Sequence, residues 1–246
     1  SLLLLGACNS FDESPYPDIQ LSENTSLPLV GLSSASACVS GDYAYILFGR
    51  TDTLNKNIYQ YNPALNSYNV HSIFPAQLRV NGIAQCVDGL IYAGLGFAPG
   101  NGIYIQSAYL TDFWCYNPLT NVWEQKADFP SNTTDKCVSF VFNNQMYVGY
   151  GFNGFEYKNE MWKYDPATDT WLKLNAGTPK RRSVAVACAT DEKVFFGTGF
   201  KTGNLNDWWE YFPETDSWAK RKSIPDNGRV NATAFTVDNR IFVATG

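Results

Sequence analysis

The chain has 246 residues, with 18 basic and 23 acidic side chains, a formal net charge of −5 and 15% aromatic residues. This length accommodates one large domain with a substantial core. Because the chain is net acidic and has no run of Lys and Arg, it lacks the charge pattern of a nucleic-acid-binding protein. Its 19 glycines, 12 prolines and many aromatics favour an all-β protein of short strands.

Residues 1–8 (SLLLLGAC) are typical of the end of a targeting signal rather than of a fold. The Leu-Gly-Ala-Cys segment that ends at Cys8 resembles a bacterial lipobox, in which the peptidase cuts before the cysteine and the thiol then carries a lipid. The resemblance implies an exported lipoprotein of the bacterial cell envelope, anchored at the outer membrane on its periplasmic or outer side. An ordinary signal segment with a chance cysteine is the alternative. No other segment reaches the about 20 apolar residues of a membrane-spanning helix, so a lipid is the only membrane anchor expected.

Residues 9–31 are rich in Ser, Pro, Asn and acidic side chains and are expected to form a linker. A strand near residues 19–29 is expected to close the structure by pairing with its last sheet. Residues 32–246 are expected to form the folded domain.

A glycine-ended apolar strand recurs in this domain. Its five copies are residues 44–49 (AYILFG), 91–96 (IYAGLG), 146–151 (MYVGYG), 194–199 (VFFGTG) and 241–246 (IFVATG), which start 47, 55, 48 and 47 residues apart. Self-similarity at a near-constant interval is the signature of a repeat architecture, and intervals near 50 residues are typical of four-stranded propeller blades.

An aromatic–proline landmark lies between these strands. Its four copies are residues 59–63 with Tyr68, residues 114–118 with Trp123, residues 162–166 with Trp171, and residues 209–213 with Trp218. The proline ends a strand and turns the chain, so each copy predicts a hairpin whose aromatics face each other or fill the gap to the next sheet. Small and β-branched residues, as in 183–187 and 230–234, predict an innermost strand before each glycine-ended one. Each repeat therefore has four strands, and the sheets pack radially.

The W-x-Y-D-P…T-D-T-W segment of residues 162–171 and the glycine-ended strands resemble kelch repeats, as in the galactose oxidase and kelch-like proteins. The resemblance implies an all-β kelch propeller with four full blades and half of a fifth, and says little about function because this fold hosts both binders and enzymes. The usual Gly-Gly doublet appears here as Gly-any-Gly, which resembles the kelch arrays of exported bacterial proteins. Without a βαβ unit these glycines are no dinucleotide fingerprint, and no cofactor is expected.

The cysteines and the histidine give no metal or catalytic signature. Cys38, Cys86, Cys137 and Cys188 are predicted in inner strands and Cys115 in an aromatic–proline strand, all as small buried thiols rather than disulfide partners. Zinc-site spacing is missing. His71 is the only histidine, so this chain alone supplies neither the two-histidine copper site of some kelch oxidases nor a Ser–His–Asp triad.

Three arginines recur at one position of the repeat. Counting 17 residues back from each terminal glycine gives Leu32, Arg79, Thr134, Arg182 and Arg229. Inner strands line the axial channel of a propeller, so Arg79, Arg182 and Arg229 are expected to ring its opening and bind an anionic ligand. This arrangement resembles the way some kelch propellers hold acidic peptides, and it resembles the anion-holding pocket of bacterial sialic-acid epimerases of this fold. Structural pairing with neighbouring carboxylates or inter-blade carbonyls is the alternative.

Aromatic residues begin the loops that leave the glycine-ended strands. Phe97, Phe152 and Phe200 follow the second, third and fourth copies, and the long loop of residues 97–112 adds Tyr104 and Tyr109. Long loops on a rigid scaffold are common recognition sites, so these rings are candidate contacts for a sugar face or a peptide side chain. Packing over the channel is the alternative.

The sequence therefore favours a non-catalytic propeller that binds an anionic carbohydrate or an acidic peptide or protein partner. The second hypothesis is an enzyme on an acidic sugar, similar to N-acetylneuraminate epimerase. Its general acid and base would come from loop carboxylates such as Glu156, Glu160 or Asp207.

Overall fold

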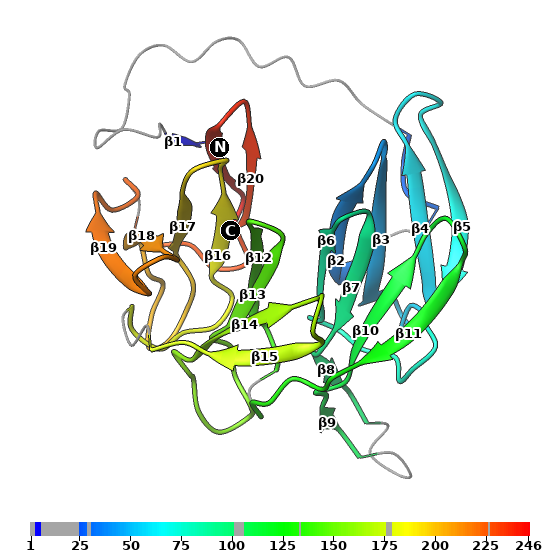
Figure 1. Cartoon of the computed structure of the whole chain (residues 1–246), viewed down its shortest axis with the longest axis horizontal. Helices are drawn as coiled ribbons and strands as arrows, with labels where there is room; N and C mark the ends of the chain where they lie inside the picture. Colours follow the sequence, from blue (N-terminus) through cyan, green and yellow to red (C-terminus); the bar gives the residue numbers. More distant parts are fainter. Residues whose placement is uncertain are drawn as a thin grey trace. The chain divides into compact units, whose positions relative to one another are not determined.

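The computed structural model describes residues 3–5, 25–28, 31–100, 106–132, 134–175, 179–225 and 227–246. Every regular element in these ranges is a β-strand (Figure 1), and none of them forms a helix able to cross a bilayer. The chain divides into two compact units. The first unit consists of residues 22–137 and 165–171, and the second consists of residues 1–21, 138–164 and 172–246.

The first unit contains two four-stranded antiparallel sheets whose strand order follows the chain. One sheet consists of β2 (Ser33–Ser40), β3 (Tyr43–Arg50), β4 (Asn57–Asn62) and β5 (Ser67–Ile73). The other consists of β6 (Ile83–Val87), β7 (Leu90–Gly94), β10 (Phe113–Asn117) and β11 (Val122–Lys126). The loop between β7 and β10 forms a small hairpin of its own from β8 (Phe97–Ala98) and β9 (Ala108–Tyr109).

The remaining sheets repeat the same order. The third consists of β12 (Val138–Phe142), β13 (Gln145–Gly149), β14 (Met161–Asp165) and β15 (Thr170–Lys173). The fourth consists of β16 (Val186–Ala189), β17 (Val194–Gly197), β18 (Trp208–Phe212) and β19 (Ser217–Arg221). The fifth contains β20 (Thr233–Val237) and β21 (Arg240–Ala244). The expected kelch architecture of four full blades and half of a fifth is confirmed.

The N-terminal leucines are part of the fifth sheet, which differs from the sequence expectation. β1 (Leu3–Leu5) pairs antiparallel with β21, with Leu3 opposite Val243. In the other four sheets the third strand pairs with the glycine-ended strand in this way, so β1 takes the place of a third strand. Cys8 lies outside the described residues, as does most of the expected closing strand at 19–29, and its described part, residues 25–28, is not a strand.

The landmark aromatics fill the space between neighbouring sheets. In the first unit, Trp123 stacks on Tyr116 with ring centroids 4.7 Å apart, and its indole N–H donates to the Ser72 hydroxyl of the preceding sheet at 3.3 Å. In the second unit, Trp218 lies at the same 4.7 Å from Tyr211. Tyr116 and Tyr211 are buried in the two hydrophobic cores against which these tryptophans pack. The aromatics nine residues apart do not face each other, since Trp114 and Trp209 lie opposite Gln125 and Lys220. The tyrosine two residues further along takes the place opposite the tryptophan.

One backbone hydrogen bond links each blade to the next. The donor is the backbone amide of the glycine that follows the second strand of a blade. The acceptor is a backbone carbonyl oxygen in the loop before the next blade, 17 residues ahead of the glycine that follows that blade's second strand. The four bonds run from Gly49 to Arg79 (3.1 Å), from Gly96 to Thr134 (2.9 Å), from Gly151 to Arg182 (3.0 Å) and from Gly199 to Arg229 (2.8 Å). Each bond lies within one unit.

The Gly-any-Gly pattern follows from this contact. Thr198 and Gly199 have consecutive positive φ values of 59° and 97°, and a Cβ on Gly199 would lie 2.7 Å from the Ser183 carbonyl oxygen. A Cβ on Gly197 would overlap the Asp207 carbonyl oxygen and the Trp208 ring. The second glycine therefore permits the turn that meets the next blade, and the first permits close approach of the third strand.

Substitution of Gly199 by alanine is expected to lower the free energy of unfolding by about 2 kcal/mol or more, because it adds left-handed strain and a clash. Gly203→Ala is the matched control, since its Cβ would meet nothing within 4 Å, and it is expected to change stability by less than about 0.5 kcal/mol. Urea unfolding of the full chain measures both, and equal effects would contradict the assigned role of Gly199.

Candidate functional site

Arg79 is a buried structural residue in the loop between β5 and β6. Its side chain is 0% exposed, and Nη1 and Nη2 each donate to one oxygen of Asp112 at 2.7 Å. Nη1 also donates to the Leu95 carbonyl at 3.1 Å and Nε to the Gln77 carbonyl at 2.9 Å. The guanidinium further lies 4.7 Å from the centre of the Phe74 ring. These contacts lie inside the blade, so the group is not displayed to a ligand.

Arg182 repeats the arrangement in the second unit. It is also 0% exposed, and Nη1 and Nη2 donate to the two oxygens of Asp207 at 2.5 and 2.7 Å. The indole N–H of Trp209 donates to the same carboxylate at 2.7 Å, as Trp114 does to Asp112 at 2.8 Å. Burial alone would raise the pKa of Asp207, but the hydrogen bonds from Arg182 and Trp209 outweigh it and hold the pKa below its usual value.

Arg229 occupies the equivalent place before β20. It is 8% exposed, and its Nη1 donates to the Thr245 carbonyl at 2.8 Å, the counterpart of the Leu95 and Thr198 carbonyls that Arg79 and Arg182 contact. At this position of the repeat, the backbone carbonyl accepts the hydrogen bond from the glycine of the preceding blade. The bond forms with arginine or threonine at the position, so it does not depend on the side chain. The expected ring of ligand-binding arginines is corrected accordingly: the geometry of Arg79 and Arg182 corresponds to the structural alternative.

The loop aromatics form two clusters, one in each unit. In the first unit, Phe97 lies opposite Tyr109 in the β8–β9 hairpin with ring centroids 5.1 Å apart. In the second unit, Phe152 lies 4.8 Å from Tyr157, which lies 6.4 Å from Phe200. Tyr104 lies outside the described residues. Tyr157 was not singled out from the sequence, although its place five residues after Phe152 in a short loop indicates that the two rings can meet.

Charged side chains flank the cluster of the second unit. The Glu156 carboxylate lies 2.5 Å from Lys158 Nζ and 4.0 Å from Arg181 Nη1. Arg181 is 56% exposed, in contrast to the buried Arg182 beside it. Lys180 and Lys201 are also exposed on these loops. The solvent-exposed arginine of this loop is therefore Arg181, whereas the repeat pattern had predicted its neighbour Arg182 as the ligand contact.

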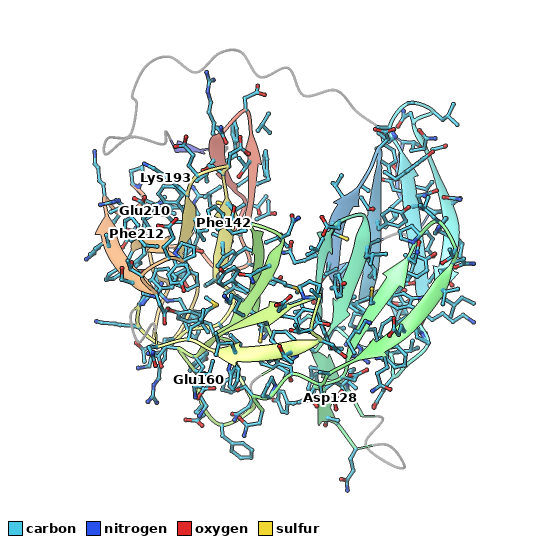
Figure 2. The ribbon with its side chains drawn as sticks, viewed as in Figure 1. Asp128, Phe142, Glu160, Lys193, Glu210 and Phe212 are labelled. Carbon is cyan, nitrogen blue, oxygen red and sulfur yellow. The ribbon has the colours of Figure 1, made fainter. Side chains whose placement is uncertain are left out.

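The three candidate acid–base carboxylates have different surroundings. Asp207 is held by Arg182 and Trp209, which removes it from the candidates for proton transfer. Glu160, labelled in Figure 2, immediately precedes β14, and one of its oxygens accepts from Lys173 Nζ at 2.9 Å. Glu156 lies in the charged group described above. The residues described contain no group of three or more His, Cys, Asp or Glu side chains placed to hold a metal ion.

Asp135 is a buried carboxyl that sequence reasoning missed. It follows Thr134, is 7% exposed, and accepts a hydrogen bond from the Asn81 side chain at 2.7 Å. Burial raises the pKa of Asp135, and the Asn81 hydrogen bond and the Lys136 charge only partly offset it. The Asn81 contact joins the loops that precede β6 and β12, so its first role is to link blades.

The described cysteines and the histidine are structural. All five cysteines have free thiols, as predicted, although Cys137 lies one residue before β12 rather than inside it. His71 lies in the outer strand β5, with its ring edge-on to Tyr45 and Tyr116 at 5.6 and 6.0 Å. Its Nε2 donates to the Pro118 carbonyl at 3.2 Å, which adds a link between the two sheets of the first unit.

Removal of the Arg182 guanidinium is expected to lower the stability of the fold, not the affinity for a ligand. Arg182→Ala should lower the free energy of unfolding by about 3 kcal/mol, because it strands a largely buried carboxylate. The neighbouring Arg181→Ala is the control and should change stability by less than about 0.5 kcal/mol. Urea unfolding at neutral pH compares them, and an unchanged stability for Arg182→Ala would restore this arginine as a ligand candidate.

Comparisons with known proteins agree with this architecture. The KLHDC2/KLHL20/DRC7 Kelch-repeats domain matches residues 101–246. N-acetylneuraminate epimerase of Pasteurella multocida is 30% identical over 115 residues, 43% of this chain and 30% of that protein. Kelch-like protein 23 of Homo sapiens is 25% identical over 165 residues, 64% of this chain and 27% of that protein. The chain thus spans 30% or less of the length of these two curated relatives.

A solved structure of YjhT superposes with a TM-score of 0.72 at 20% identity, covering 89% of this chain and 73% of that one. A likeness at this identity shows the fold. The family match covers more than half of the chain, and the protein therefore belongs to the KLHDC2/KLHL20/DRC7 Kelch-repeats domain family.

Proposed function

We propose that the chain is a ligand-binding kelch propeller that recognises an anionic ligand through the loops around Phe152 and Phe200. The observation that carries the proposal is the aromatic cluster of Phe152, Tyr157 and Phe200 with exposed cations beside it. Phe200 is 37% exposed, so its ring is accessible to a partner. Loops held on a rigid scaffold are suited to recognition because their side chains are already positioned.

The local charge supports an anionic partner. Residues 152–158, 179–183 and 200–203 carry four cations and one anion once Arg182 is set aside as the partner of Asp207. These loops contact one another through the Tyr157–Phe200 rings, the Arg181–Glu156 pair and a hydrogen bond from the Arg182 amide to the Lys158 carbonyl. A cationic surface on a chain of net charge −5 attracts anions selectively.

The second candidate is an epimerase of acidic sugars. It is favoured by the similarity to N-acetylneuraminate epimerases from Pasteurella multocida and Salmonella arizonae, the latter 32% identical over 98 residues. Glu156 and Glu160 are the loop carboxylates left for acid–base work, since Asp207 is bound by Arg182. Their side chains are 43% and 28% exposed, so a substrate could reach both.

Anion selectivity tests the proposal. The full chain should bind members of an array of carboxylated glycans and acidic peptides, and binding should weaken steeply with salt and vanish for neutral counterparts. An array without any anion-selective ligand would end the proposal. Adding N-acetylneuraminate and following anomeric exchange by NMR separates the two candidates, because accelerated exchange is expected only of an epimerase.

We also propose that the protein is exported and held at the bacterial cell envelope by a lipid on Cys8, on the strength of the Leu-Gly-Ala-Cys segment. Cleavage before Cys8 removes residues 1–7, so under this proposal β1 pairs with β21 only in the uncleaved chain. Mass spectrometry of the N-terminal peptide from bacterial membranes should find a diacylglyceryl-modified Cys8. Recovery of this peptide with an unmodified thiol would contradict the anchor.

A further inference from the structure

We infer that Lys158 and Arg181 form a carboxylate-binding site for an acidic carbohydrate, and that Glu156 is an internal occupant which the ligand carboxylate displaces. This inference rests on the proposed function and names the ligand class and its contacts. This site differs from the arginine ring expected from the repeat. The guanidinium groups of Arg79 and Arg182 form buried ion pairs with Asp112 and Asp207.

The internal carboxylate shows what the site accepts. Glu156 Oε1 lies 2.5 Å from Lys158 Nζ, and its other oxygen lies 4.0 Å from Arg181 Nη1. The carboxylate thus has an ammonium at hydrogen-bond distance and a guanidinium 4.0 Å away, and these two groups bind the carboxylates of ligands in proteins. A ligand carboxylate in the same place would make the same contacts.

The backbone around the site is held in place. Asn153 Oδ1 accepts from the amides of Phe155 and Glu156 at 3.0 and 2.9 Å, which fixes the turn that presents Glu156. The Lys158 amide donates to the Gly151 carbonyl, and the Lys158 carbonyl accepts from the Arg182 amide. Because Arg182 is itself anchored by Asp207, the backbone of Arg181 is fixed as well. Such preorganisation lowers the entropy cost of binding.

The occupant is weakly held and therefore replaceable. Glu156 is 43% exposed and Lys158 is 24% exposed, and ion pairs in such settings contribute little because water screens them. An occupant of this strength reduces the apparent affinity for a competing carboxylate by about twofold to fivefold. The ligand gains binding free energy that Glu156 does not, because the ligand is proposed to contact the aromatic rings as well as the two cations.

The adjoining aromatic cluster favours a carbohydrate. Tyr157 lies between Glu156 and Lys158 in the chain, and its ring lies 4.8 Å from Phe152 and 6.4 Å from Phe200. Aromatic rings pack against the C–H face of a sugar ring while its polar groups point outward. A uronic acid unit carries one carboxylate beside one such face, which matches one cation pair beside one aromatic cluster. An acidic peptide carries carboxylates on flexible stems and has no such face.

Three variants of the full chain test the inference. The probe is a tetramer of α-1,4-linked galacturonic acid, with its methyl-esterified form as the neutral control, in calorimetric titrations. Glu156→Gln should strengthen binding of the acidic tetramer by about twofold to fivefold, and Arg181→Gln should weaken it by about threefold to fivefold. Lys201→Gln, an exposed cation of the same surface that does not contact Glu156, should change binding by less than about twofold. The esterified tetramer should bind no variant detectably.

Any one of three results would overturn the inference. The first is that neither the wild type nor Glu156→Gln binds the acidic tetramer. The second is that Glu156→Gln binds it more weakly than the wild type does, and the third is that Arg181→Gln binds it as tightly as the wild type does while keeping its thermal stability. A tetraglutamate peptide that binds with this variant pattern while the galacturonate tetramer does not would assign the site to acidic peptides and refute the carbohydrate. If the array finds anionic ligands whose affinity is the same for wild type, Glu156→Gln and Arg181→Gln, the proposed function is supported and this carboxylate-binding site is refuted.

Discussion

The structure depends on the hydrogen bond between the glycine amide that ends the second strand of a blade and a carbonyl in the loop before the next blade. The bond recurs four times at 2.8–3.1 Å. It requires two consecutive residues with positive φ, which turn the chain sharply out of the strand. Because the next blade's loop lies against this turn, a Cβ on Gly49, Gly96 or Gly199 would clash with a backbone carbonyl. The bond therefore sets both where the strand ends and where the neighbouring sheet begins.

Buried charge reinforces this contact in two of the blades. Arg79 and Arg182 reach from the loop that makes the bond to the carboxylate at the start of the third strand, so one side chain holds three parts of a blade together. A paired and hydrogen-bonded charge is tolerated in such a place, whereas a single one is not. Leu32 and Thr134 stand at the same position in other repeats, and the Thr134 carbonyl still accepts from Gly96. The backbone bond is thus the general feature, and the arginine is an addition to it.

The sequence predicted the blades well because their landmarks are local. Glycine-ended strands, the Asn-Pro and Asp-Pro turns and the paired aromatics each depend on residues close together in the chain. Side-chain direction was harder to predict. A repeated arginine is expected equally from a ring of ligand contacts and from a repeated structural bond, and only the positions of Asp112 and Asp207 separate the two. The β8–β9 hairpin was missed because two-residue strands leave no pattern, and β1 because the same leucines also suit a signal segment.

These observations favour a search for functional residues at positions where one repeat differs from the others. A residue that recurs in every blade, such as Gly199 or its equivalents, serves a contact that every blade must make. The third repeat departs from the two flanking repeats at several points. It has Thr134 in place of arginine, the buried Asp135 after it, and Glu160 in place of aspartate. Its loop also holds Glu156 beside Lys158, a pair without counterpart at Gly203 and Leu205, the equivalent positions of the next repeat. Asp135 links blades through Asn81, and Glu160 pairs with Lys173. The Glu156–Lys158 pair lies partly exposed on a loop, so it is the departure that we expect to take part in ligand recognition.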